Sequence, residues 1–191
     1  MTLARLVSDA IQLLEASDLP YMVTGSLASS YHGEPRSTHD LDIVIDPTAR
    51  SLEALVAGLG ARGFYVDGAA AQEALRARSQ FNAIGQDAAK IDFIVRRDRP
   101  FSVEEFARRR PADLLGTPGF IASVEDTIVA KLEWAAATGS ERQTRDVAGM
   151  LAVGGEAIDF GYVERWVRAL GLDVPWRLAR GASRTPDGPA A

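Results

Sequence analysis

The chain has 191 residues, of which 47% are hydrophobic and 25% are charged, a composition typical of a globular protein. It contains no cysteine, which excludes disulfide bonds and thiolate metal sites. The N-terminus lacks the pattern of a signal peptide, and no segment approaches the ~18 consecutive apolar residues of a membrane span. We therefore expect a cytoplasmic protein with no membrane partner. The formal net charge of −5 argues against a protein that coats nucleic acid through bulk attraction.

The first hundred residues alternate between helical and strand patterns. Apolar residues at helical spacing, together with glycine and proline stops, predict helices over 3–14, 27–31 and 51–62. Short β-prone runs predict strands over 21–24, 41–45, 64–66, 79–84 and 90–96, the last two joined by the turn 85–88. This order predicts an α/β protein with a mixed β-sheet and flanking helices.

Beyond Pro100 the pattern becomes mainly helical. We expect helices over 102–109, from a capping Ser123 to residue 136, over 141–153 and over 161–170. The expected organisation is an α/β core over 1–115, a helical C-terminal part over 116–180 that packs on it, and a disordered tail over 181–191, which has no apolar period.

Asp40 and Asp42 flank one leucine in the predicted strand that ends at residue 45. Side chains alternate along a strand with period two, so both carboxylates should project from the face opposite Leu41. Two neighbouring carboxylates repel each other unless one is protonated or a cation binds between them. Their hard oxygen atoms suit Mg²⁺ or Mn²⁺, and the pair therefore predicts a divalent metal site. The alternative is a strand end whose acids face water.

Gly25 and Ser26 stand where a predicted strand turns into a predicted helix. Glycine permits close approach of the backbone, and the free N–H groups of a helix start favour a phosphate. Ser26 is also able to cap that helix and to offer its hydroxyl to the same anion. Gly-Ser is a common turn when it occurs alone, so its meaning depends on the Asp-x-Asp strand that follows.

Asp92 lies in an otherwise apolar strand, KIDFIV, on the face opposite Ile91 and Phe93. A charge there either accepts hydrogen bonds or pairs with an arginine, or it joins Asp40 and Asp42 around metal. Three converging carboxylates, two metal ions and a phosphate-binding turn would form a site for in-line nucleotidyl transfer.

These residues resemble a known family. Gly25-Ser26, thirteen further residues, Asp40-Leu-Asp42 and a later strand with Asp92 resemble the nucleotidyltransferase superfamily built on the DNA polymerase β-like core. The segment 123–151 is similar to the C-terminal part of the abortive-infection toxin type, in which a Lys-Leu helix precedes an Arg-Asp helix. The resemblance implies that Asp40 and Asp42 bind the metals and that Asp92 helps to activate the acceptor hydroxyl.

The same resemblance implies a nucleotide site. Lys131 would contact the phosphates of a nucleoside triphosphate and Asp146 would support the site. The chain has only two lysines, Lys90 and Lys131, against nineteen arginines, which favours a specific role for Lys131. The alternatives are a solvated Lys131 and an Asp146 paired with Arg142 on its own helix. Arg36 either reaches the triphosphate or lies in a solvated loop.

The acceptor is open at this point. Eight arginines between residues 76 and 110 form either a phosphate-facing surface, which would favour tRNA, or a solvated face. We therefore expect a Mg²⁺- or Mn²⁺-dependent nucleotidyltransferase that uses a nucleoside triphosphate. By the toxin-like resemblance it would modify tRNA or a protein and have a cognate antitoxin. The alternative function is a catalytically inactive binding or antitoxin module of the same fold.

Overall fold

The computed structural model describes residues 1–86 and 89–183, and the chain divides into two compact units. The first, here called the sheet unit, comprises Met1–Leu27 and Ser37–Ala122. The second, here called the helical unit, comprises Ala28–Arg36 and the described residues from Ser123 onward. The predicted α/β class is confirmed, because the sheet unit contains one mixed sheet with helices packed on it.

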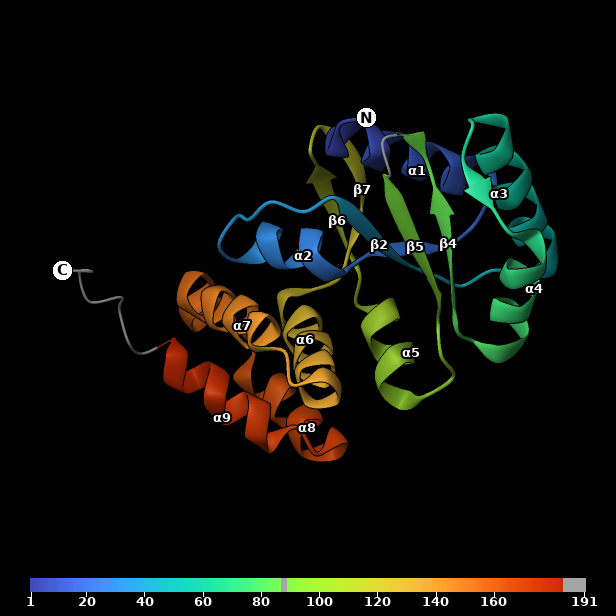
Figure 1. The fold of residues 1–191 in the computed structure, drawn as a ribbon. Coiled ribbons are helices and arrows are strands. Elements are labelled where there is room, and N and C mark those ends of the chain that lie inside the picture. The colour runs from blue at the N-terminus through green and yellow to red at the C-terminus, as the bar shows by residue number, and fades with distance from the viewer. Residues whose placement is uncertain (87–88, 184–191) are drawn as a thin grey trace. The chain divides into compact units, whose positions relative to one another are not determined.

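The sheet has seven strands in the order β3-β4-β5-β2-β1-β7-β6 (Figure 1). The β2 and β5 strands are parallel, as are β1 and β7, and the other neighbours are antiparallel. The bounds are β1 Tyr21–Val23, β2 Asp40–Ile45, β3 Tyr65–Val66, β4 Gln80–Ile84, β5 Lys90–Val95, β6 Arg110–Leu114 and β7 Thr117–Ile121.

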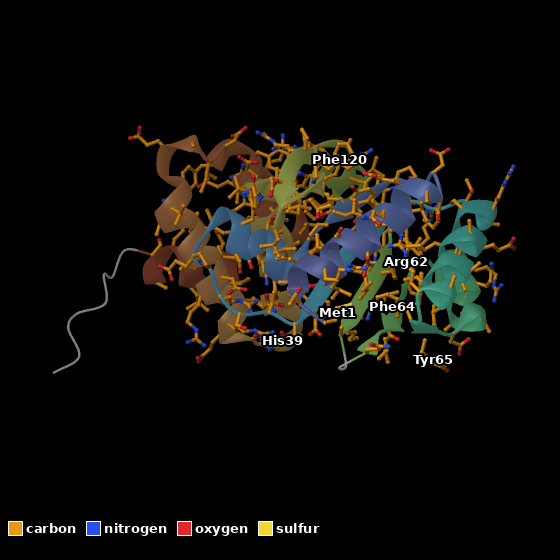
Figure 2. The ribbon with its side chains drawn as sticks, turned by 90° about the horizontal axis from the view of Figure 1, so that it is seen from above. Met1, His39, Arg62, Phe64, Tyr65 and Phe120 are labelled. Carbon is orange, nitrogen blue, oxygen red and sulfur yellow. The ribbon has the colours of Figure 1, made fainter. Side chains whose placement is uncertain are left out.

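One face of the sheet forms the main core of this unit. Leu41, Ile43 and Phe93 point into it and are fully buried. The helices of the sheet unit are α1 Leu3–Ala16, α3 Ala49–Ala61, α4 Gly68–Ala77 and α5 Pro100–Ala107. The α1 helix contacts β2, β7 and α3, and Arg62 at the end of α3 donates to the backbone oxygen of Asp9 in α1 at 2.7 Å (Figure 2). The amphipathic pattern of α1 is thus explained by burial against the sheet and α3.

The opposite face of the sheet is divided along the strands. Near the ends of β2 and β5 it carries Val44 and Ile94, which form a small apolar cluster with Met22, Ala122 and Phe106 of α5. Near the beginnings of the same strands it carries acidic residues, and this half of the face is described below as the candidate site.

The helical unit contains α6 Val124–Thr138, α7 Glu141–Gly154, the 3₁₀ turn η2 Gly155–Ala157, α8 Phe160–Leu170 and α9 Asp173–Ala182. The α6 helix contacts α7, α8 and α9, and these four helices lie together (Figure 1). Their shared core includes the fully buried Leu132, Val147 and Val163. The α2 helix, Gly25–His32, starts in the sheet unit and continues into the helical unit from Ala28.

Several elements differ from the sequence predictions. The α4 helix, the hairpin of β6 and β7, and α9 were not predicted, whereas the other helices and strands occur within a few residues of their expected bounds. Of the predicted turn 85–88, the last two residues lie outside the described part, as do residues 184–191 of the predicted tail. Within the described part, no helix is long and apolar enough to cross a membrane.

Candidate functional site

The acidic half of the sheet is built from two neighbouring parallel strands, β2 and β5. Their register places Asp42 directly opposite Asp92 and Asp40 directly opposite Lys90. All four residues therefore lie on one face, here called the carboxylate face. Asp40 is exposed and the other three are partly buried, while Leu41 and Ile91 of the same strands are buried on the other face. The prediction that the three aspartates share one face of the sheet is confirmed.

The Gly25-Ser26 turn lies against Asp42. Gly25 has a φ of +64°, and a Cβ atom at this position would lie 1.9 Å from Asp42 Oδ2. Only glycine accommodates both this conformation and the close approach of the carboxylate. The Ser26 N–H donates to Asp42 Oδ2 at 3.4 Å, a long hydrogen bond that links the first turn of α2 to the Asp42 carboxylate of β2.

The structure corrects one detail of the prediction for Ser26. Helix α2 begins at Gly25, so Ser26 lies inside its first turn and is not the residue that caps it. The backbone N–H of Ser26 faces a carboxylate of the protein, not an open anion site. The turn therefore holds Asp42 in place.

Lys90 is a member of the carboxylate face that the sequence analysis did not select. Its Nζ lies 2.8 Å from Asp92 Oδ2. The hydrogen bond to Asp92 raises the pKa of Lys90, partial burial opposes this, and the negative charges of Asp92, Asp40 and Asp42 add to the increase. The signal was present in the sequence, since strand alternation puts Lys90 on the same face as Asp92. The alternative partner expected for Asp92, an arginine, is thus replaced by a lysine.

The chemistry of the carboxylate face suits a divalent metal, but its side chains are not gathered into a ready ligand set. Three carboxylates on adjacent strands offer hard oxygen atoms of the kind that Mg²⁺ and Mn²⁺ prefer. Among the residues that the structure describes, however, no three His, Cys, Asp or Glu side chains are close enough to hold a metal ion together. Asp92 is instead paired with Lys90. The donor types fit the metal, and rotation of these side chains would be needed to bring them together.

The helical unit contains a second group of charged residues around Asp146 of α7, here called the Asp146 network. Arg36 binds the carboxylate with two nitrogen atoms, Nε to Oδ1 at 3.0 Å and Nη2 to Oδ2 at 3.1 Å. Lys131 of α6 donates to Oδ2 at 2.8 Å, and the hydroxyl of Ser29 in α2 donates to the same oxygen at 3.4 Å. Three predicted site residues, Arg36, Lys131 and Asp146, are thus in direct contact.

Burial distinguishes this network from a surface ion pair. The side chains of Lys131 and Asp146 are only 6% and 8% exposed, and that of Arg36 is 26% exposed. A solvated Lys131 is therefore wrong, as is a solvated Arg36. Burial alone would raise the pKa of Asp146, but hydrogen bonds from Arg36 and Lys131, with their positive charges, lower it below its ordinary value. Asp146 therefore stays ionised and holds both cations.

Close packing of the segment after α2 on α7 brings these residues together. A Cβ atom on Gly33, just after α2, would lie 2.9 Å from the backbone nitrogen of Met150 in α7. The chain after α2 therefore runs directly along α7, and Arg36 reaches Asp146 from there. This contact was not predictable from local sequence pattern, because 110 residues separate the two side chains.

A cavity of about 330 Å³ lies next to the network. It is lined by Ser29, Glu34, Pro35, Arg36, Arg142, Arg145, Asp146 and Gly149. Arg142 and Arg145 are exposed on α7 and form no ion pair with any residue in the described ranges, so the alternative in which Asp146 pairs with Arg142 is wrong. Three arginines against two carboxylates give the lining a positive charge, which suits an anionic ligand.

Several arginines between residues 76 and 110 interact with neighbouring side chains of the sheet unit. Arg78 pairs with Asp98 at 2.6 Å and Arg96 pairs with Asp46 at 3.0 Å. Arg76 pairs with Glu73, and Arg109 stacks over the ring of Phe106. Acids therefore offset part of the positive charge of Arg76, Arg78 and Arg96, which weakens the argument for a phosphate-facing surface at these three residues.

His39 lies beside Asp40 in the loop before β2 and is exposed (Figure 2). With Asp40 also exposed, this end of the carboxylate face opens to solvent. The start of β2 is thus accessible to solvent, whereas the other end of the same face is covered by the apolar cluster around Phe106.

No protein-family model matches the chain, and no curated protein sequence does. Two solved structures are similar along most of its length. An antigenic nucleotidyltransferase-like protein from Paracoccidioides brasiliensis is 17% identical with a TM-score of 0.58, over 93% of this chain and 91% of that chain. The lincosamide antibiotic adenylyltransferase LnuA, solved with lincomycin bound, is 12% identical with a TM-score of 0.57, over 80% of this chain and 98% of that chain. The chain therefore has the nucleotidyltransferase fold.

Proposed function

We propose that the chain is a metal-dependent nucleotidyltransferase, which moves a nucleoside monophosphate from a nucleoside triphosphate to an acceptor hydroxyl. The observation that carries this proposal is the carboxylate face with its turn. Asp42 and Asp92 lie opposite each other, Asp40 shares their face, and the Gly25-Ser26 turn rests on Asp42. Such a group of acids on a nucleotidyltransferase fold supports metal-assisted phosphoryl chemistry more directly than a structural role.

Each acid has a proposed task. Asp40, Asp42 and Asp92 would hold Mg²⁺ or Mn²⁺, and the ion, when bound, supplies positive charge that neutralises the phosphate oxygens. Asp92 accepts the proton of the acceptor hydroxyl. A bond forms between that oxygen and the α-phosphorus as the bond from the α-phosphorus to the bridging oxygen breaks, and pyrophosphate leaves.

We assign nucleotide binding to Gly25, Ser26, Arg36, Lys131 and Asp146. Arg36 and Lys131 would contact the β- and γ-phosphates, and Asp146 would keep both cations oriented. The positive lining of the cavity beside Asp146 supports an anionic ligand for the helical unit. Because one carboxylate already binds both cations, we expect them to contribute about one net positive charge, and Arg142 and Arg145 are available to add to it.

For the acceptor we propose a hydroxyl of tRNA or of a protein, with a cognate antitoxin as partner, on the basis of the toxin-type pattern in residues 123–151. Since Arg78 and Arg96 are already paired with acids, we expect recognition of tRNA to involve its terminal hydroxyl more than its phosphate backbone. The structural similarity to an adenylyltransferase with lincomycin bound makes lincomycin a sensible third acceptor to test.

The test measures transfer of α-³²P label from each of the four nucleoside triphosphates, with Mg²⁺ or Mn²⁺, into total tRNA, into cell protein and into lincomycin. The wild type is compared with the double variant Asp40→Asn/Asp42→Asn. The matched control is Asp18→Asn, an exposed residue with a φ of +48° that asparagine adopts readily. We expect label only with the wild type and the control. Equal labelling by the double variant would reject the assigned site.

The second candidate is a binding module of the same fold without catalysis. The pairing of Asp92 with Lys90 favours it, because this pairing leaves no ready three-carboxylate ligand set in the described residues. A nucleoside triphosphate would then raise the melting temperature although no label is transferred with any acceptor. Transfer to any of the acceptors would exclude this candidate.

A further inference from the structure

Both lysines of the chain are paired with acids to which we have assigned a function. Lys90 lies 2.8 Å from Asp92 and Lys131 lies 2.8 Å from Asp146. The other basic side chains are nineteen arginines. A lysine carries a compact charge on a flexible stem, whereas an arginine presents a planar fork. Lysine at position 90 therefore places a small, mobile cation among the carboxylates of the sheet.

Lys90 belongs to the carboxylate face itself. The register of β2 and β5 sets Lys90 opposite Asp40, and its ammonium bonds to Asp92 on its own strand, two residues away. Its side chain is 38% exposed, so it has room to move away from Asp92, whose side chain is 17% exposed. One positive charge thus stands among three negative charges where a divalent ion would bind.

We propose that Lys90 is a positioning residue, which holds Asp92 and weakens the binding of a divalent ion to the nucleotide-free protein. This inference rests on the metal site of the proposed function. The ammonium occupies an oxygen of Asp92 that the ion would otherwise use, and its charge repels the ion. Asp40 and Asp42 are then the acids that first receive the metal, and Asp92 joins them only when Lys90 swings away.

The experiment measures the binding of Mn²⁺ to the nucleotide-free protein, by calorimetric titration and by the loss of the free Mn²⁺ electron paramagnetic resonance signal. Lys90→Met removes the charge and keeps a side chain of similar length, whereas Lys90→Arg keeps the charge. The matched control is Arg110→Met, which removes a positive charge from the exposed edge strand β6, three strands away from β2.

We expect Lys90→Met to bind Mn²⁺ roughly tenfold more tightly than the wild type, because one repelling charge a few ångströms away is removed and Asp92 is released. Lys90→Arg keeps the positive charge and should therefore bind Mn²⁺ within about twofold of the wild type. Arg110→Met should also stay within about twofold, since the charge that it removes is distant and screened by salt. Lys90→Gln is the second neutral variant, should Lys90→Met lower the melting temperature.

Unchanged or weaker Mn²⁺ binding in both neutral variants would overturn the inference, as would equal tightening in Arg110→Met. The label-transfer assay keeps this result separate from the proposed function. Tighter Mn²⁺ binding without transfer by the wild type would support the role of Lys90 and reject the enzyme. Transfer by the wild type with unchanged Mn²⁺ binding in the neutral variants would support the enzyme and reject the role of Lys90.

Discussion

Loss of the Asp146 carboxylate should destabilise the helical unit. Its carboxylate binds Arg36 and Lys131 together, and it is 8% exposed. In Asp146→Asn both cations lose their counter-charge, and the side chain of Lys131 is itself only 6% exposed. Removing one partner of a buried ion pair destabilises a protein by about 3 kcal/mol or more. We expect a decrease of that size in the free energy of unfolding, measured by urea denaturation at pH 7.

The same variant has a defined pH dependence. The pKa of Asp146 is lowered in the folded chain, so its stabilising effect is complete above the ordinary carboxyl range and is lost as pH falls through the folded pKa. The difference in unfolding free energy between the wild type and Asp146→Asn should therefore be constant from pH 7 down to about 5 and shrink below about 4. Asp173→Asn, an exposed control on α9, should differ from the wild type by less than about 0.5 kcal/mol throughout. A gap that widens in acid would contradict the ionised state of Asp146.

At the scale of elements, the junction between β1, α2 and β2 depends on Gly25. Its φ of +64° and the close approach of Asp42 both oppose a side chain there. Gly25→Ala should lower the free energy of unfolding by about 2 kcal/mol and reduce nucleotidyl transfer, because the carboxylate of Asp42 must move. Gly60→Ala in α3 is the matched control, since a Cβ atom there meets nothing within 4 Å and alanine favours helices. Equal losses in both variants would show that the conformation of the turn is unimportant.

Sequence pattern predicted the central elements well and the peripheral ones poorly. The β2 and β5 strands were predicted because buried apolar residues alternate with acids in them. The β6-β7 hairpin was missed because Pro111 and Pro118 argue against strands. Proline is tolerated at Pro111 because β6 is an edge strand, and at Pro118 because β7 is registered with β1 only at Ile121. The α4 helix was missed in an alanine-rich segment without a strong apolar period, yet Asp67 before it caps two backbone N–H groups.

The candidate site was predictable to a similar degree. Strand alternation was enough to place Asp40, Asp42 and Asp92 on one face, and the glycine before a helix indicated a close backbone approach. The contacts of Asp146 were not predictable from local pattern, because Arg36 comes from a segment more than a hundred residues away. Lys90 was not predicted as a member of the site, although it lies two residues before Asp92 on the same face of the strand. The pattern that predicted the site consists of aspartates alone, and a lysine is not part of it.

At the scale of the whole molecule, many of the positively charged side chains are paired with acids of the same chain. The net charge is −5, and Arg78 and Arg96 of the arginine-rich middle segment pair with Asp98 and Asp46. The positive charges that remain available near the Asp146 cavity are Arg142 and Arg145. The lining of this cavity carries more positive than negative side chains, and part of the charge of the arginine-rich segment is offset by acids.

This charge distribution predicts the affinity of the protein for RNA and its dependence on salt. Affinity for nucleic acid through phosphate contacts falls steeply with salt, with a slope in log–log form close to the number of phosphates neutralised. We expect binding to total tRNA to be weak at about 150 mM salt and to show a slope of no more than about two, as measured by filter binding between 50 and 200 mM NaCl. Asp98→Asn, which removes an acid that binds Arg78 and Arg96, should tighten tRNA binding and steepen the slope by up to about one. A slope of five or more in the wild type would mean that the paired arginines exchange their carboxylate partners for phosphates. A backbone-coating mode of tRNA recognition would then replace recognition of the terminal hydroxyl.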